Sequence, residues 1–455
     1  MLKAGFAKYD ITPRVGVQLY GFGAYLNRYS IGVRAPLEAR AAVLEMAGKR
    51  IAVVGCDLCK VPEFMIRKIR EQVGQRHPEL LPDGLIISAS HTHSGPAVIE
   101  EDRGWGAPDH PYLELLPVKI AEAVHLAAER LEPVTFSVGS APCEHLGLNR
   151  VFDRDAPPLE EVLRDDWRPA KPELTDTVCR VLKFTGAAGE LKGFMAYFGC
   201  HPVVCSASNR YIHGDYAGVA MQQLMREFPG STGIFLQGAE GDVNSGCVHK
   251  PEGESLLALD VFAARFANSV RSALASAEKA DAGTLKCRMK TFDFSTRKTF
   301  NEAHLQEMRK KFSEVLLDPE LPDSDGRSRI NTVYLRGAAK MMEALLQDKV
   351  TVKAEICAVR LGPVRLFGTP FEVMQGIKNE VMERITDGLP LVLSLCNGAS
   401  GYAPSYEVAQ ADMDKAAGGG YEATIAPLIS GQLPFEKIHD ELVEAILELN
   451  RELEN

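Results

Sequence analysis

The stretch Leu85-Ile-Ile-Ser-Ala-Ser-His-Thr-His-Ser-Gly-Pro96 combines the strongest structural signal in the chain with its strongest chemical one. An apolar run leads into two histidines two residues apart, His91 and His93, and Gly95-Pro96 closes the segment. The pattern predicts a strand that runs into a tight turn and brings two imidazoles to one rim of a sheet. Imidazole is the commonest protein metal ligand and titrates near neutral pH. The segment alone leaves two interpretations open, a metal or proton-transfer site and a solvated histidine pair on a strand edge.

Length and charge limit the classes of protein. The 455 residues suffice for one large domain or two to three ordinary ones. The formal net charge of -10 argues against nucleic acid and anionic membrane surfaces as partners. No apolar run approaches the ~18 residues of a spanning helix, so we expect no integral membrane association. Oligomeric state is not readable from the sequence.

The N-terminus and the cysteines predict a cytoplasmic protein. Met1-Leu-Lys-Ala-Gly-Phe6 lacks the apolar stretch of a secretory signal, although a signal already removed would leave the same appearance. The 10 cysteines are scattered, and several lie in apolar stretches, which favours reduced, buried thiols. Cys56-Asp-Leu-Cys59 has no second C-x-x-C partner, so a redox or zinc-knuckle role is disfavoured.

Apolar runs alternate with amphipathic stretches along the chain, which predicts an α/β domain with buried sheet. Strands are expected at Ile51–Cys56, Leu85–Ser88, Phe194–Phe198, Gly233–Leu236, Val364–Phe367 and Leu391–Cys396. Helices are expected near Glu63–Val73, Leu113–Leu131, Tyr216–Phe228, Leu257–Leu274 and Glu372–Ile385, with an amphipathic helix at the C-terminal end. Residues 300–347 predict a charged helical hairpin inserted into this body, as a lid, a dimer contact or a plain surface insertion.

Polar side chains follow five of the predicted strands. Open α/β sheets bind ligands beyond the carboxyl ends of their strands, so these positions are candidates for one site. Zinc hydrolases commonly use two histidines and a carboxylate and leave one position open for water. In chain order the strand ends offer His91 and His93, then His201, then Asp242 or Glu240 in the segment Gln237–Ser245, then Glu372, and finally Tyr402.

Each candidate also has a purely structural interpretation. His201 precedes Pro202 and would start a turn, and Glu372 would favour the dipole of a helix that begins there. Asp242 would bond its own backbone in a Gly-flanked turn, and Tyr402 would be half-buried packing. His213 would orient a neighbour or lie on the surface. The histidines expected to be non-catalytic are His77, His125, His145, His249, His304 and His439.

With these residues assembled, the chain resembles the N-terminal catalytic domain of the neutral/alkaline non-lysosomal ceramidases. The resemblance rests on the order of its motifs and on their spread over nearly the whole chain. The matching segments are Ala7–Pro13, Gly21–Gly23, His91–Pro96, Leu148–Arg150, His201-Pro202, His213–Gly218, Gly241–Val243, Pro370–Glu372, Gly401-Tyr402 and Gly420–Glu422.

The resemblance implies mixed β-sheets sandwiched by helices in one catalytic domain, residues 1–455, with the hairpin inserted into it. It also implies one zinc ion per chain. By position, the ligands would be His91, His201, Glu372 and Tyr402. His93 would lie beside the metal and contact substrate or transfer protons, and Arg150 and Tyr421 would line the site.

Two departures weaken the case for ceramide as substrate. In the ceramidases a catalytic serine follows Gly-Asp-Val, where this chain has Asn244. Ser245 is a poor substitute because adjacent residues usually point in different directions. The ceramidases also carry a secretion signal and a C-terminal β-sandwich domain, and this chain shows neither.

The resulting hypothesis is a zinc-dependent hydrolase that cleaves an amide bond of a small or lipid-like N-acylated substrate. Zinc would activate a water, and His93 or Tyr421 would polarise the carbonyl oxygen. His93 would also protonate the leaving nitrogen, and Asp242 would hold a metal-bound histidine in its tautomer. Asn244 cannot act as a nucleophile, but its amide would donate to an oxyanion.

Two alternatives stay open at the level of sequence. One is an amidohydrolase barrel, which also uses a His-x-His pair but needs a late metal-binding aspartate that this chain does not suggest. The other is a non-catalytic binding protein of the same fold, supported by Asn244. Retaining a buried set of unliganded polar groups is costly, which argues against the second alternative.

Overall fold

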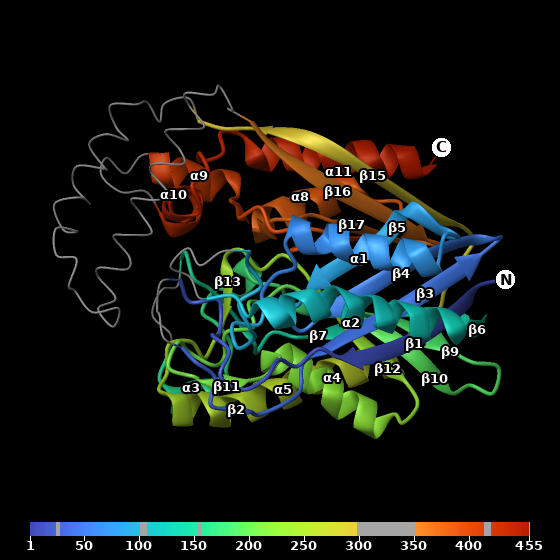
Figure 1. The fold of residues 1–455 in the computed structure, drawn as a ribbon. Helices are drawn as coiled ribbons and strands as arrows, with labels where there is room; N and C mark the ends of the chain where they lie inside the picture. The colour runs from blue at the N-terminus through green and yellow to red at the C-terminus, as the bar shows by residue number, and fades with distance from the viewer. Residues whose placement is uncertain (24–27, 101–106, 153–156, 298–350, 414–419, 455) are drawn as a thin grey trace.

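The computed structural model describes residues 1–23, 28–100, 107–152, 157–297, 351–413 and 420–454 (Figure 1). The predicted hairpin at residues 300–347 lies outside these ranges.

Three sheets make up the body of the molecule. The first, in the order β5-β4-β3-β1-β6, comprises β1 (Lys3–Asp10), β3 (Glu38–Met46), β4 (Lys49–Cys56), β5 (Leu80–Ala89) and β6 (Glu132–Pro133). The second, in the order β12-β10-β9-β7-β14, comprises β7 (Thr135–Pro142), β9 (Val178–Thr185), β10 (Leu191–Phe198), β12 (Thr232–Gln237) and β14 (Glu278–Lys279). The third, in the order β15-β16-β17-β19, comprises β15 (Leu285–Ser295), β16 (Thr351–Leu361), β17 (Val364–Gly368) and β19 (Leu389–Leu393).

Each sheet carries helices on its outer face (Figure 1). The first sheet packs against α1 (Glu63–Arg76) and α2 (His110–Glu129). The second packs against α4 (Asp215–Glu227) and α5 (Glu252–Ala275). The third packs against α8 (Gln375–Arg384) and α11 (Ile438–Glu454). The mixed sheets covered by helices confirm the predicted α/β class.

Strand β4 shows why the apolar runs are continuous. Ala52 and Val54 face the core beneath α1 and α2, whereas Ile51 and Val53 face a central core shared by the three sheets. Side chains alternate between faces along a strand, so a strand buried on both faces needs apolar residues at every position. The same central core contains residues of the other two sheets, such as Met195 and Leu366.

One parallel strand pair in each sheet positions the site. The pairs are β4–β5, β10–β12 and β17–β19, and nearly all other pairings in these sheets are antiparallel. Both strands of a parallel pair end on the same side, so the loops that follow them collect at one edge. The described strands thus form open sheets, which excludes the amidohydrolase barrel for this part of the chain.

The predicted strands and helices are confirmed, with one correction near the site. Glu372 does not begin a helix: it lies on the two-residue strand β18 (Glu372–Val373), and α8 begins at Gln375. Strand β18 pairs with β20 (Tyr402–Ala403), and this long-range pairing replaces the helical turn expected from local sequence. Helix capping therefore does not account for Glu372.

Shorter elements complete the described structure. These are β2 (Gly32–Val33), β8 (Gly147–Asn149), α3 (Leu159–Val162), β11 (Tyr211–Ile212), β13 (Val243–Ser245), α9 (Tyr406–Met413), a π-helical turn (Tyr421–Ile425) and α10 (Ala426–Ser430). A 3-10 turn covers Pro172–Leu174.

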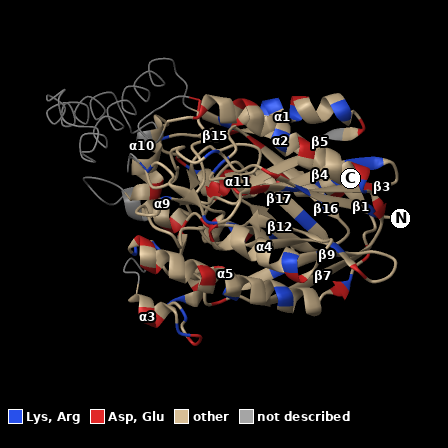
Figure 2. Ribbon diagram, turned by 60° about the horizontal axis from the view of Figure 1, so that its bottom comes forward, with Lys and Arg blue, Asp and Glu red and all other residues tan. Residues whose placement is uncertain are grey.

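Charge and thiol placement agree with the sequence. Acidic and basic residues are interspersed over the helices and loops (Figure 2), and many pair across the surface, as Lys68 does with Glu114. All ten cysteines are buried and free of disulfides. Among the helices that the structure describes, none has the length and apolarity needed to cross a membrane.

Candidate metal centre

His91 leaves strand β5 in a turn that fixes its ring orientation. Its backbone adopts a left-handed φ of 69°, and its N–H donates to the Leu58 carbonyl (2.9 Å). Ring atom Nδ1 lies 2.7 Å from the Cys59 carbonyl oxygen. A carbonyl oxygen only accepts, so Nδ1 carries the proton and Nε2 presents a lone pair. The backbone of residue 59 thus sets the tautomer of His91.

His201 follows strand β10 and is held in the same way. Its Nδ1 lies 2.6 Å from the Glu240 carbonyl oxygen, so this nitrogen is also the donor and Nε2 is the free acceptor. Gly199 permits the approach of the two loops, because a Cβ there would lie 2.3 Å from the Ala239 carbonyl oxygen. His201 itself is fully buried.

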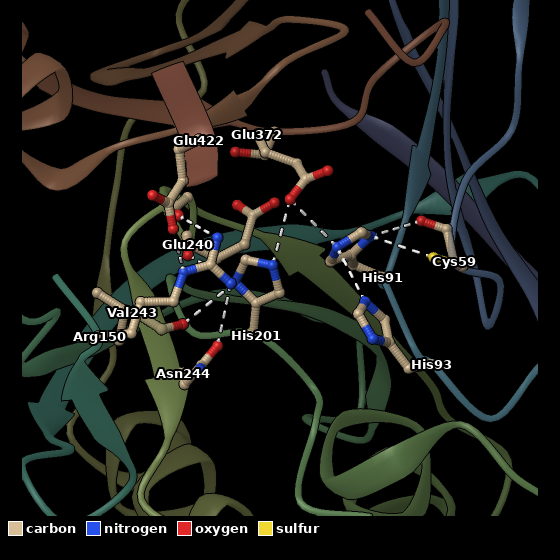
Figure 3. Close-up of polar contacts among 12 residues, drawn as sticks. Cys59, His91, His93, Arg150, His201, Glu240, Val243, Asn244, Glu372 and Glu422 are labelled. Atoms are coloured by element: carbon tan, nitrogen blue, oxygen red, sulfur yellow. Dashed lines mark hydrogen bonds and ion pairs between the residues drawn. The ribbon is translucent and has the colours of Figure 1, made fainter. Parts of the chain in front are cut away.

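Glu372 reaches both histidines from strand β18, a few residues after strand β17 of the third sheet. Its Oε2 lies 3.2 Å from His201 Nε2 and 3.4 Å from His91 Nε2 (Figure 3). One ligand atom from each of the three residues lies within 4.8 Å of the other two. We call His91, His201 and Glu372 the central triad.

The donor set of the central triad fits a cation. Two imidazole lone pairs and a carboxylate oxygen converge, while both Nδ1–H groups are committed to carbonyls. Acceptors that face one another repel unless a proton or a cation lies between them. Two histidines and one carboxylate also form a common zinc-binding set in hydrolases. The triad can therefore hold a metal ion with no change of tautomer.

Electrostatics within the central triad are strongly coupled. Burial alone would raise the pKa of Glu372, but the two histidines hold it well below its usual value. Burial, reinforced by the Arg150 cation, lowers the pKa of His201 to about 4. Burial also opposes charge on His91, yet Cys59 and Glu372 together raise the pKa of His91 well above its usual value. In the absence of a cation, the shared proton belongs on His91.

His93 lies beside the central triad. Its Nε2 is 3.3 Å from His91 Nε2, and its ring meets Phe22 edge-on at 4.7 Å between centroids. Gly21 makes this contact possible, because a Cβ there would lie 2.3 Å from His93 Cγ. Burial, together with His91 and His201, lowers the pKa of His93 well below its usual value. The surroundings of His93 therefore favour its neutral form.

Tyr402 stands next to Glu372 through strand pairing. The two residues are register partners in the parallel β18–β20 pair, so their side chains share a face. The Arg150 guanidinium lies 5.3 Å from the Tyr402 ring centroid, and the Tyr421 ring lies 5.9 Å away on another side. Tyr402 is only 9% exposed, whereas Tyr421 is 41% exposed and lies on the solvent side of the group.

Arg150 ties several loops of the site together (Figure 3). Its Nη2 donates to the Gly241 carbonyl (2.8 Å), its Nη1 to Asn244 Oδ1 (3.3 Å), and its Nε pairs with Glu422 (2.9 Å). The structure thus brings Arg150 beside the predicted ligand Tyr402 and beside Asn244.

Asp242 does not contact either histidine of the central triad. Its Oδ2 accepts from Asn149 Nδ2 (3.0 Å) and its Oδ1 from the Gln375 backbone N–H (2.9 Å). The tautomer-holding contact expected from Asp242 is instead made by two backbone carbonyls. Ser245 is fully buried and donates to the Cys247 carbonyl (3.3 Å), while Asn244 remains half-buried.

Sequence reasoning missed Cys59 and left Glu240 only as an alternative to Asp242. Both present a backbone carbonyl to a triad histidine, which residue type does not reveal, and Cys59 also acts on His91 through its thiol. The Glu240 carboxylate is also fully buried, and burial raises its pKa to about 8. Its position directly after strand β12 was the available signal, because strand ends supply the other residues of the site.

A second buried group contains Cys205, His213 and Asp215, and we call it the second cluster. Asp215 accepts three backbone hydrogen bonds, from Val204 (3.3 Å), Cys205 (3.2 Å) and Tyr216 (2.7 Å). His213 Nδ1 accepts from the Asp215 backbone N–H (3.1 Å), and its Nε2 faces Asn209 Nδ2 (3.2 Å). These lone pairs are already engaged, so the cluster is a structural network.

The chain has sequence relatives among the neutral ceramidases. The chain is 24% identical over 258 residues to the neutral ceramidase of Pseudomonas aeruginosa, an alignment of 54% of this chain and 37% of the relative. Neutral ceramidase A of Dictyostelium discoideum is 26% identical over 258 residues, which cover 53% of this chain and 35% of the relative. The match therefore spans only about a third of each relative's own length.

Solved structures show the same fold over most of the chain. The crystal structure of neutral ceramidase from Pseudomonas aeruginosa superposes with a TM-score of 0.71 at 17% identity, covering 98% of this chain and 75% of that one. A structure described as ceramidase complexed with C2 superposes with a TM-score of 0.70 at 18% identity, covering 98% and 76%.

The family model provides the remaining comparison. The model of the N-terminal region of neutral/alkaline non-lysosomal ceramidases matches residues 2–290, which is more than half of the chain. The resemblance stated from the sequence is confirmed, and the chain belongs to the neutral/alkaline non-lysosomal ceramidase family.

Proposed function

We propose that this protein is a zinc-dependent hydrolase that cleaves the amide bond of an N-acylated substrate. The observation that carries the proposal is the convergence of His91 Nε2, His201 Nε2 and Glu372 Oε2. Family membership supports hydrolysis of an amide. The names of the relatives, and the neighbour described as bound to C2, support a lipid-like substrate. The catalytic unit would be the whole chain.

One zinc ion per chain would be held by His91, His201, Glu372 and Tyr402. The first three present free acceptor atoms, and Tyr402 is their neighbour through the β18–β20 register. When bound, zinc would supply Lewis acidity, which lowers the pKa of a water and polarises the scissile carbonyl. This ligand set keeps the four residues predicted from the sequence.

His93 would transfer the proton. His93 Nε2 lies 3.3 Å from His91 Nε2, beside the proposed metal position, and from there it would take a proton from the attacking water. The same proton would then pass to the amide nitrogen as the carbon–nitrogen bond breaks. The water oxygen ends in the carboxylic acid product, and the proton ends on the amine.

Asn244 and Tyr421 would stabilise the carbonyl oxygen in the transition state. Arg150 donates to Asn244 Oδ1, which fixes the amide so that its Nδ2 remains a donor. Tyr421 would reach the substrate from the solvent side. Arg150 would shape the binding wall, and Asp242 would act as a positioning residue through Asn149 and the start of α8.

The test is an activity screen on purified protein. N-acyl amides from acetyl to long-chain sphingoid amides are incubated with the zinc-loaded enzyme, the chelated enzyme and the reconstituted enzyme. We expect amine release that chelation abolishes and zinc restores. Activity that survives complete metal removal would contradict the proposed chemistry.

A second candidate function rests on Asn244, which replaces the family's serine. In that case the chain would bind an N-acyl amide without cleaving it. Calorimetry with the same panel separates the two: tight binding with no turnover, followed by gain of hydrolysis in Asn244→Ser, would favour the binding protein.

A further inference from the structure

Arg28 is a buried arginine beside the central triad that the proposed mechanism does not use. Arg28 lies in the loop between β1 and β2, and it is only 6% exposed. Nη2 donates to the His93 carbonyl (2.9 Å) and weakly to the Asn209 carbonyl (3.4 Å). Nε and Nη1 are buried and have no hydrogen-bond partner among the described residues.

Within the part of the chain that the structure describes, Arg28 also has no carboxylate partner. No aspartate or glutamate of the described ranges forms an ion pair with it, and burial lowers its pKa to about 10. By contrast, the buried Arg40 is held by both Glu38 and Asp57. A buried guanidinium with unused donors is unfavourable unless an anion pairs with it.

The surroundings of Arg28 connect it to the reacting region. Its guanidinium lies 5.0 Å from the Phe22 ring centroid, and Phe22 also contacts the His93 ring edge-on, with 4.7 Å between ring centroids. His93 Nδ1 is likewise buried without a partner in the described structure. Unused polar atoms of Arg28 and His93 therefore belong to one group of contacting residues, Arg28, Phe22 and His93.

We propose that Arg28 binds a carboxylate carried by the amine portion of the substrate, so that the enzyme acts on N-acyl amino acids. This inference rests on the proposed function, which assigns protonation of the leaving nitrogen to His93. The group attached to that nitrogen then extends past His93 toward Arg28. A carboxylate two bonds from the nitrogen supplies the missing counter-charge, which the neutral alcohol of a sphingoid base does not.

The test compares two substrates that differ only in charge, N-dodecanoyl-glycine and N-dodecanoyl-glycinamide. We measure the ratio of their kcat/KM values in the wild type, Arg28→Met, Arg28→Lys and the control Arg34→Met. Arg34 lies nearby in sequence but pairs on the surface with Asp260 (2.6 Å). A hydrogen bond to a charged group predicts a wild-type preference for the carboxylate of about 10- to 100-fold.

We expect Arg28→Met to abolish this preference, Arg28→Lys to keep part of it and Arg34→Met to keep all of it. If the wild type cleaves N-dodecanoyl-glycinamide as well as N-dodecanoyl-glycine, the inference about Arg28 is wrong and the proposed function still holds. That outcome needs no variant, so poor folding of Arg28→Met does not affect it.

Failure of the proposed function has a different signature. If the zinc-loaded wild type cleaves neither compound, thermal denaturation still tests the carboxylate site. The carboxylate site is supported without hydrolysis if N-dodecanoyl-glycine raises the Tm more than N-dodecanoyl-glycinamide does. This difference in Tm should be smaller in Arg28→Lys. Equal shifts in the wild type would refute the carboxylate site.

Discussion

The central triad and the second cluster contain similar residues but differ in the direction of their backbone groups. In the triad, carbonyl oxygens of Cys59 and Glu240 face the imidazole Nδ1 atoms and leave the Nε2 lone pairs free. In the second cluster, backbone N–H groups face the Asp215 carboxylate and the His213 ring and occupy their lone pairs. A carbonyl at Nδ1 leaves the Nε2 lone pair of a histidine free for a cation. A backbone N–H at Nδ1 occupies the ring lone pair and leaves the histidine a structural role.

The second cluster still serves the site. Asp215 starts helix α4 and holds the backbone at Val204 and Cys205, a few residues after His201. The cluster thus fixes the loop that carries a triad histidine. We expect the triad to bind a cation and the second cluster to support the loop after His201. Variants in the two groups can separate these roles.

The largest expected difference is in zinc affinity. Glu372→Gln should lose more than about 100-fold in affinity because a neutral amide replaces the anionic ligand. Asp215→Asn, the matched control, should stay within about threefold. Competition with a chromophoric chelator, together with metal analysis of the purified proteins, measures both. If Glu372→Gln binds zinc with wild-type affinity, the assignment of the triad as the zinc site is wrong.

Stability should show the reverse ranking. Asp215→Ala leaves three buried backbone N–H groups without an acceptor, which should lower the unfolding free energy by about 3 kcal/mol or more. Glu372→Ala in metal-free protein breaks the buried pair with His91, but His91 can then lose its extra proton, so the loss of unfolding free energy should stay below that of Asp215→Ala. Urea unfolding in the presence of chelator gives both values. A larger loss in Glu372→Ala would reverse the division of roles.

The loss of unfolding free energy at acid pH should depend on His213. Burial lowers its pKa from 6.5 to about 3, so below pH 6.5 the unfolded chain binds a proton that the native state resists. Unfolding free energy should therefore fall between pH 6.5 and 3, with a contribution of up to about 1.4 kcal/mol per pH unit from this residue. In His213→Asn the slope should decrease by that amount, as urea unfolding of metal-free protein at several pH values would measure. An unchanged slope would mean that His213 is not the buried neutral group.

The smallest effect is expected for Cys59→Ser. The carbonyl of residue 59 lies 2.7 Å from His91 Nδ1, whereas the thiol lies 3.5 Å away, so the backbone holds the ring. Zinc affinity should therefore change by less than about threefold. The chelator competition used for Glu372→Gln gives the value, with wild type measured in parallel. A tenfold loss of zinc affinity in Cys59→Ser would indicate that the thiol itself binds the metal.

Much of the fold was predictable because the strands that form the site are buried on both faces. Runs such as Leu85–Ser88 and Phe194–Phe198 are apolar at nearly every position, so the polar residue that follows each one stands out. This contrast identified His91 and His201. It also located Glu372, although the local pattern suggested a helix where the chain forms a strand with residues 402–403.

The rest of the site depends on contacts that a linear pattern does not carry. The tautomers of the triad rest on carbonyls, which every residue has. Arg28 looks like a surface arginine in its loop, and only the packing of Phe22 and His93 around it reveals its burial. Asp242 was expected to touch a histidine because it follows a strand, but its carboxylate turns toward Asn149 and Gln375.

The assembly of the triad from three separate sheets has a consequence for the timing of folding. His91, His201 and Glu372 follow β5, β10 and β17, so no single sheet contains a complete set of acceptors. Contacts between residues so distant in the chain form late and slowly. A chain that ends at residue 290, the limit of the family match, would keep both histidines and lack the carboxylate. Tight capture of a cation would then mark a chain that has finished folding.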